Sequence, residues 1–154
     1  MAPLDMLRSL TRGERPRRIV IGFVAGFVGT LIFHQGMLGT LHALGIAPIA
    51  PFSLQPTSPL GVPEVWSLAF WGGVWGIAYA FAEGLLTRWL GYWLGATLFG
   101  AILPTLAFRF IVMPLKDIPA GNVSASLLIT GLLVNAAWGL GTAFFFMLGM
   151  RRKG

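Results

Sequence analysis

The chain has no cysteine and few charged residues of any kind. Of its 154 residues, 10% are charged and 56% are hydrophobic. The absence of cysteine excludes disulfides, thiolate nucleophiles and cysteine-ligated zinc or iron–sulfur sites. A soluble domain carries roughly 25% charged residues, so a chain this poor in charge must bury much of its surface in lipid. The composition therefore predicts an integral membrane protein with one domain.

Acidic residues are scarcer than basic ones, and the basic ones gather at the two ends. The formal net charge is +6, with one cluster from Arg8 to Arg18 and another at Arg151, Arg152 and Lys153. A basic chain can bind nucleic acid, but this composition leaves no soluble domain to carry a binding fold. We expect the lipid bilayer, with its anionic surface, to be the partner of both clusters, and no nucleic acid.

Long apolar segments are what the chain has in abundance. A run of roughly 18 or more apolar residues predicts a transmembrane helix. The first run is longer than the core of a signal peptide, so we expect an uncleaved helix. The sequence predicts an all-α bundle of four transmembrane helices in a single domain, 19–150, with helices at 19–44, 65–87, 91–113 and 124–150.

The segments between and around these helices are short. Residues 1–18 form a basic N-terminal segment, and residues 151–154 form a basic tail. The loop 46–64 holds five prolines and no lysine or arginine, and proline disfavours a helix there. Only Arg88 to Leu90 separate the second and third helices, which predicts an antiparallel helical hairpin.

The distribution of lysine and arginine predicts the orientation. If both termini are cytoplasmic, the inside holds five basic residues at the N-terminus, Arg88 and three at the C-terminus, and the outside holds only Arg109 and Lys116. Nine against two is a clear positive-inside bias. We therefore expect a multi-pass protein of a bacterial inner membrane with cytoplasmic termini and an outer proline-rich loop.

Small residues recur along one face of each predicted helix. Such faces let helix backbones approach closely, and this packing drives association where lipid surrounds the helices. In the first helix the face continues to Gly36 and Thr40. The glycines predicted to pack between helices are Gly22, Gly26, Gly29, Gly72, Gly76, Gly91, Gly95 and Gly131.

Two segments resemble each other within the chain. Residues 75–88 align with residues 138–151 at a constant offset of 63, and both begin with Trp-Gly and end with arginine. If this is a repeat, its axis lies along the membrane normal, since both segments run in the same direction. Duplication and chance similarity between apolar helices are both open.

Four polar residues are predicted to lie at a similar depth in the outer half of the membrane. With a rise of about 1.5 Å per residue, His34, Gln35, Arg109 and Asn135 could meet there. Polar side chains at such depth usually face a partner or water. The alternatives are local: Asn135 bonding across helices, Arg109 extending to headgroups, and His34 satisfied within the core.

Charged residues near the cytoplasmic surface have a simpler interpretation. We expect Glu83 and Arg88 to be interfacial charges, with Glu83 paired to Arg17, Arg18 or Arg88. His34 and His42 are poorly spaced for one metal or haem, so we expect no metal and no cofactor.

The order of these features resembles the YagU-type bacterial inner-membrane proteins. The similar segments are the glycine-rich start of the first helix after Arg17 and Arg18, then residues 79–86, 110–119 and the span ending at Arg151. The sequence departs from that pattern in the spacing of Tyr79 and Glu83, at Leu132, and in a shorter first loop. The resemblance implies an inner-membrane protein with a link to acid tolerance, and no catalytic residue.

Three functional classes follow from these observations. We favour a non-enzymatic accessory or stress-associated component that packs with itself, as a homo-oligomer, or in a larger membrane complex. A small oligomeric channel or carrier would instead use His34, Gln35, Arg109 and Asn135 along a path. A cofactor-binding subunit of a membrane redox complex is least favoured, because no reactive set of residues is present.

Overall fold

The computed structural model describes residues 14–119, 121 and 123–151, and this part of the chain is mostly helical. Four of its helices are long and apolar enough to cross a membrane, which confirms the predicted number of spans. The first span contains α2 (Glu14–Gly29), the π-helix η1 (Thr30–His34) and α3 (Gln35–Ala43); the second is α4 (Glu64–Leu90); the third contains α5 (Tyr92–Ala107), the π-helix η2 (Phe108–Val112) and α6 (Met113–Leu115); and the fourth is α7 (Ala125–Arg151).

The first helix begins before the predicted start at residue 19. It already includes Arg15, Arg17 and Arg18. Long basic side chains are compatible with the end of a membrane helix, because the charged head can reach the interface while the stem stays on the apolar surface. Residues 1–13 of the predicted basic segment and residues 152–154 of the predicted tail lie outside the described residues.

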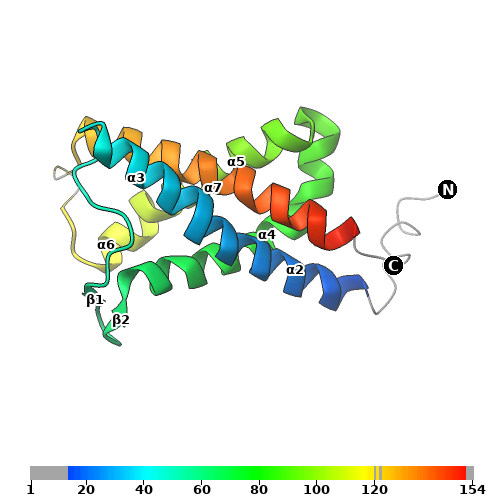
Figure 1. Cartoon of the computed structure of the whole chain (residues 1–154), viewed down its shortest axis with the longest axis horizontal. Coiled ribbons are helices and arrows are strands. Elements are labelled where there is room, and N and C mark those ends of the chain that lie inside the picture. Colours follow the sequence, from blue (N-terminus) through cyan, green and yellow to red (C-terminus); the bar gives the residue numbers. More distant parts are fainter. Residues whose placement is uncertain (1–13, 120, 122, 152–154) are drawn as a thin grey trace.

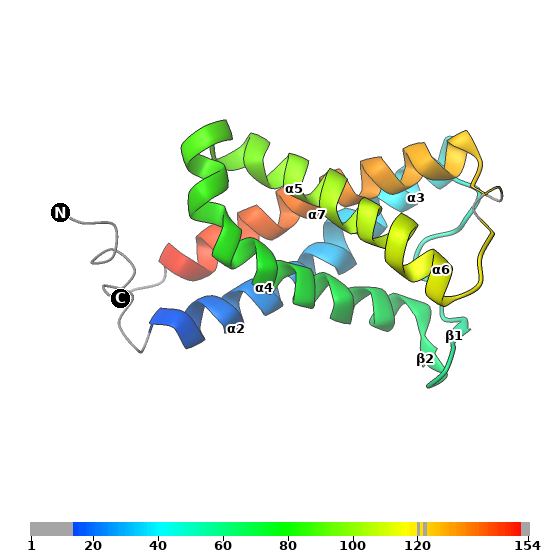
Figure 2. The ribbon, with the colours of Figure 1, turned by 180° about the vertical axis from the view of Figure 1, so that it is seen from behind.

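The helices form a bundle whose two ends differ (Figure 1). At one end, which we call the basic end, lie the start of α2, the connection from α4 to α5 and the end of α7. At the other, the loop end, lie residues 44–63 and residues 116–119. The helix α2 contacts both α4 and α7, and α5 contacts α7 and α4. Figure 2 shows the same bundle from behind, with α4 and α5 in front.

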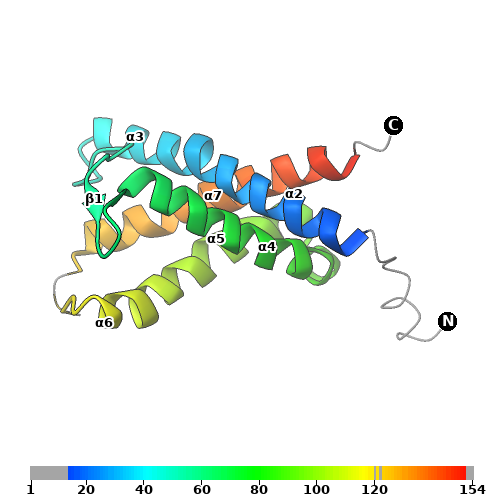
Figure 3. The ribbon, with the colours of Figure 1, turned by 90° about the horizontal axis from the view of Figure 1, so that it is seen from below.

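The bundle consists of two antiparallel pairs. The first hairpin is α2, η1 and α3 with α4; the second is α5, η2 and α6 with α7. Figure 3 shows α5 and α6 on the side of the bundle away from α2 and α3. A core of Tyr79, Phe99, Trp138 and Phe146 lies between the hairpins, and their rings meet edge-on or stacked.

Glycines bring α2 and α4 into backbone contact. A Cβ on Gly26 would lie 2.9 Å from the Cα of Gly76, and a Cβ on Gly22 would lie 2.7 Å from the carbonyl oxygen of Gly76. The same holds at Gly72, where a Cβ would meet Thr30 and Gly26. Distances this short exclude any larger residue without movement of the backbone, so glycine is required on both sides of this contact.

The second hairpin has an equivalent contact. A Cβ on Gly100 would lie 2.8 Å from the Cα of Gly139, and a Cβ on Gly139 would lie 3.1 Å from the carbonyl carbon of Ala96. Gly100 also faces the backbone of Asn135. Neither Gly100 nor Gly139 was among the glycines predicted to pack between helices, yet these two hold the second hairpin together.

Two of the predicted packing glycines, Gly91 and Gly131, do not pack between helices. Gly91 has φ +80 in the turn between α4 and α5, and a Cβ there would meet nothing within 4 Å. Its positive φ, not helix packing, accounts for the glycine. A Cβ on Gly131 would also meet nothing within 4 Å. Gly29 and Gly95 do lie close to other residues, Gly29 to Thr142 of α7 and Gly95 to Leu86 across the turn.

Each π-helix begins where the regular backbone pattern is disturbed. The Gly26 carbonyl accepts hydrogen bonds from the Thr30 hydroxyl at 2.9 Å and the Trp138 indole at 3.0 Å, just before η1. Such side-chain bonds compete with the helix's own ladder. Pro104 stands four residues before η2 and has no N–H to donate to the helix. The proline in α5 and the bonds in α2 thus break the α-helical register of the first and third spans.

Candidate functional site

Gln35 connects the first span to the proline-rich loop. Its side chain is 1% exposed, and its Oε1 accepts a 2.6 Å hydrogen bond from the backbone N–H of Phe52. Phe52 has φ 55, an uncommon conformation for a residue with a side chain. The Gln35 amide also lies 3.4 Å from Nδ1 of His34. Of the predicted polar pair at 34 and 35, Gln35 therefore holds the loop in place, and His34 contacts the Gln35 amide.

The loop is held by hydrogen bonds within it and by one to α7. The two-residue strands β1 (Pro56–Thr57) and β2 (Val62–Pro63) pair antiparallel, and the Thr57 hydroxyl donates to the Val62 carbonyl at 2.8 Å. At the start of the loop, the Ser126 hydroxyl of α7 donates to the Ile46 carbonyl at 2.6 Å. The first loop thus packs on the loop end of the fourth span.

Asn135 and Arg109 make separate contacts. The Asn135 amide donates a 2.9 Å hydrogen bond to the Thr105 hydroxyl, which joins α7 to α5. The Arg109 guanidinium lies 5.9 Å from the ring centroid of Phe110, its neighbour in η2. Among the described residues, no hydrogen bond links either of them to His34 or Gln35, so the four polar residues do not form one hydrogen-bonded group.

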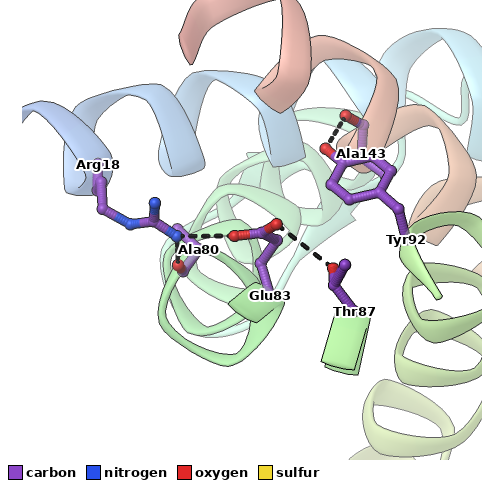
Figure 4. A network of polar contacts seen from close by, with 6 residues as sticks. All are labelled: Arg18, Ala80, Glu83, Thr87, Tyr92 and Ala143. Atoms are coloured by element: carbon purple, nitrogen blue, oxygen red, sulfur yellow. Dashed lines mark hydrogen bonds and ion pairs between the residues drawn. The ribbon is translucent and has the colours of Figure 1, made fainter. Parts of the chain in front are cut away.

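A second polar cluster lies at the basic end, as Figure 4 shows. Arg18 of α2 points toward α4, where its Nη2 lies 3.1 Å from Oε2 of Glu83 and donates a hydrogen bond to the Ala80 carbonyl. Its guanidinium also lies 5.1 Å from the ring centroid of Phe146. Of the three arginines considered as partners of Glu83, Arg18 makes the ion pair.

Tyr92 occupies a matching place in the second hairpin. It begins α5, and its hydroxyl donates a 2.7 Å hydrogen bond to the Ala143 carbonyl of α7 (Figure 4). Neither this residue nor the Arg18–Ala80 bond was predicted. The internal repeat could have indicated that the two acceptors are equivalent, since Ala80 and Ala143 are aligned in it at the offset of 63.

Arg17 and Arg88 complete the basic end in different ways. Arg17 donates from Nη2 to the carbonyls of Gly149 and Met150, both at 3.0 Å. The last carbonyls of a helix have no partner within it, so a cation there satisfies them and interacts favourably with the negative end of the helix dipole. Arg88 is exposed at the end of α4, with its guanidinium 5.6 Å from the ring centroid of Trp89.

A cavity of about 290 Å³ opens beside this cluster. We call it the basic-end cavity. It combines charged, phenolic and apolar side chains from all four spans, and its lining is Arg18, Glu83, Tyr92, Phe146, Met147, Met150 and Arg151. Among the described residues no group of three histidine, cysteine or acidic side chains is placed to hold a metal ion. His42 instead bonds locally, with Nδ1 3.1 Å from the Ala47 carbonyl oxygen.

The described residues thus contain two kinds of polar contact. Those of the loop end fix a loop or join two helices, whereas those of the basic end surround a cavity with two arginines. Comparison of the chain with known protein families, with curated proteins and with solved structures finds no match.

Proposed function

We propose that the chain is a non-enzymatic, multi-pass protein of a bacterial inner membrane. In this proposal it is an accessory or stress-associated component that packs against copies of itself or against a larger membrane complex. The observation that carries the proposal is an open groove of about 380 Å³ on the side of the bundle. The groove lies between the first and fourth spans, and its lining is Ile32, Phe33, Gly36, Met37, Thr40 and Ala137.

Gly36 makes this groove a suitable surface for another helix. A Cβ on Gly36 would meet nothing within 4 Å, so nothing inside the bundle requires a glycine there. In membrane proteins, small residues on an outer helix face permit close approach of a neighbouring helix. The groove therefore supports packing by a partner helix.

The use of the polar side chains also favours this role over a carrier. A carrier would need His34, Gln35, Arg109 and Asn135 along one path, but their contacts go to a loop, a neighbouring ring and an adjacent helix. Polar side chains used in this way stabilise a fixed arrangement of helices. The carrier and the cofactor-binding subunit are the less supported alternatives.

The membrane and the orientation belong to the same proposal. Arg15, Arg17, Arg18, Arg88 and Arg151 all belong to segments that meet at the basic end, which the positive-inside rule assigns to the cytoplasm. The resemblance to YagU-type proteins supports a bacterial inner membrane and a link to acid tolerance. A reporter fused after Lys153 should be active only in a cytoplasmic assay, and periplasmic activity would contradict the orientation.

Co-purification tests the packing role. The tagged full-length chain is isolated in a mild detergent as wild type, Gly36→Leu and Gly84→Leu. Both glycines are exposed, and a Cβ at either meets nothing within 4 Å, so the two variants differ only in the surface they alter. We expect Gly36→Leu to lose the associated copies or partner and Gly84→Leu to keep them. A wild-type chain that elutes only as a monomer would contradict the proposal.

A further inference from the structure

The basic-end cavity has a chemistry that the packing role does not use. Its charged lining contains two cations, Arg18 and Arg151, and one anion, Glu83, which leaves one positive charge in excess. Its volume of about 290 Å³ is at the lower end of the range for sites that bind small ligands. A cavity of this size and sign suits a compact anionic group.

Arg18 keeps donors available to such a group. Both of its hydrogen bonds, to the Ala80 carbonyl and to Glu83, start from the same nitrogen, Nη2. Within the described part of the chain, its Nε and Nη1 have no hydrogen-bond partner. Because the ion pair and the Ala80 bond hold the guanidinium in place, its remaining N–H groups are fixed before any ligand arrives. Arginine in this state is well suited to phosphate oxygens.

The rest of the lining is apolar. Phe146, Met147 and Met150 come from the last turns of α7. A free inorganic ion gains nothing from such side chains, whereas an acyl chain packs against them. The helix that carries them crosses the membrane and ends here, so the cavity lies where lipid headgroups meet acyl chains.

We propose that the basic-end cavity binds an anionic phospholipid. Its phosphodiester accepts hydrogen bonds from Arg18 and pairs with Arg151, while the start of an acyl chain packs on Met147, Met150 and Phe146. Basic cavities between membrane helices at the cytoplasmic surface hold anionic headgroups in this manner. The site makes no use of the groove at Gly36, and it stands whether or not the chain has a protein partner.

The test compares two arginines that the internal repeat makes equivalent. Arg88 and Arg151 end the aligned segments, both are exposed, and only Arg151 lines the cavity. The full-length chain in mild detergent is titrated with short-chain phosphatidylglycerol, and the rise in the thermal unfolding midpoint gives the concentration for half-saturation. We expect Arg151→Gln to raise that concentration roughly fivefold to tenfold, and Arg88→Gln to change it less than about twofold.

A third variant moves the binding in the opposite direction. Glu83→Gln removes the anion beside the site without changing its size, and the amide oxygen can still accept from Nη2 of Arg18, so the guanidinium stays in place. Phosphatidylglycerol should therefore bind more tightly, by roughly fivefold. A purely structural role of the cluster would not give tighter binding after loss of an ion pair. Short-chain phosphatidylcholine, which has the same phosphate but no net charge, should saturate only at higher concentration.

Three results would overturn the proposal. If Arg151→Gln and Arg88→Gln weakened phosphatidylglycerol binding equally, the effect would come from the general positive charge of the surface and not from the cavity. Inorganic phosphate that raises the unfolding midpoint as well as phosphatidylglycerol does, at equal concentration, would make a free anion the ligand instead of a lipid. An unchanged response in Glu83→Gln would place the bound phosphate outside the cavity.

Discussion

The first and second hairpins make the same three contacts with different residues. In the first, Arg18, Gly22 and Gly26 of α2 face Ala80, Gly76 and Gly72 of α4. In the second, Tyr92, Ala96 and Gly100 of α5 face Ala143, Gly139 and Asn135 of α7. The first helices correspond at an offset of 74 and the second helices at 63. The two hairpins thus share one pattern of contacts.

The difference between the hairpins lies in the contact nearest the basic end. A charged guanidinium reaches the Ala80 carbonyl in the first hairpin, and a neutral phenol reaches the Ala143 carbonyl in the second. At the place of Glu83 the second hairpin has Phe146, which contributes to the core. Close backbone approach is thus common to both hairpins, whereas only in the first does a charged side chain make the contact nearest the basic end, and that asymmetry places an ion pair beside the basic-end cavity.

The largest effect should come from filling the close contacts. Gly26→Ala places a Cβ 2.9 Å from the Cα of Gly76, and Gly100→Ala places one 2.8 Å from the Cα of Gly139. Because backbone must move in both cases, we expect each variant to lose more than roughly 2 kcal/mol of stability. Unfolding of the purified chain in detergent measures this loss. Gly84→Ala is the matched control and should be neutral or more stable by up to about 1 kcal/mol. A tolerated Gly100→Ala would break the equivalence of the hairpins.

Loss of the charged contact should have the next largest effect. Arg18→Ala removes the ion pair with Glu83, the donor to Ala80 and the cation above Phe146. The two charged side chains are each 20% exposed, so the cost should lie between those of a surface pair and a buried pair, at about 2 kcal/mol.

A double-mutant cycle separates the ion pair from the other contacts of Arg18. Arg18→Ala and Glu83→Gln are measured singly and together, and the coupling should be about 1 kcal/mol. Arg88→Ala serves as the control for loss of one positive charge at the same end and should change stability by less than about 0.5 kcal/mol. A coupling near zero would mean that the two charges do not stabilise the first hairpin.

Loss of the neutral hydrogen bond from Tyr92 to Ala143 should cost less stability. Tyr92→Phe removes only the hydroxyl that donates to Ala143, so the expected loss is about 1 kcal/mol, typical of one neutral hydrogen bond. Because no charge is involved, this loss should be the same at low and high salt, whereas the Arg18–Glu83 coupling should weaken as salt rises. Equal salt dependence in the two hairpins would remove the distinction between them.

The sequence predicted the parts of this fold that depend on composition and local pattern. Four long apolar helices, a tight connection between the second and third, and a partner for Glu83 among three arginines all followed from apolar runs and charge. The connection was predicted at Arg88 to Leu90 but lies at Gly91, because α4 continues to Leu90. The sequence did not predict which glycines would lie against each other, because that depends on which helices pack together and on the faces they present. That is why Gly131 was expected to pack and Gly139 was not, although both lie in the fourth span.

The π-helix η1 explains why the predicted small-residue face of the first helix is wrong beyond Gly29. The predicted small face of the first helix runs through Gly29 to Gly36 and Thr40 at a constant angle of about 100° per residue. A π-turn inserts one residue and rotates everything after it by that angle. Beyond η1 the buried residues are therefore Gln35, Leu38 and Leu41, while Gly36 and Thr40 face outward. Periodicity in an apolar segment cannot reveal such an insertion, so the groove at Gly36 was beyond sequence reasoning.

The smallest effect should come from the contact nearest the loop end, where Asn135 stands at the place of Gly72. Its amide donates to Thr105, so Asn135→Ala should lose about 0.6 kcal/mol, the average for a hydrogen bond between membrane helices. A cycle with Thr105→Ala should assign all of that loss to the pair. The reverse exchange, Gly72→Asn, should prevent folding, because even a Cβ there would meet Thr30 and Gly26. If Asn135→Ala cost as much as Arg18→Ala, Asn135 would belong to a larger polar network, and the loop end would then differ between the hairpins as much as the basic end does.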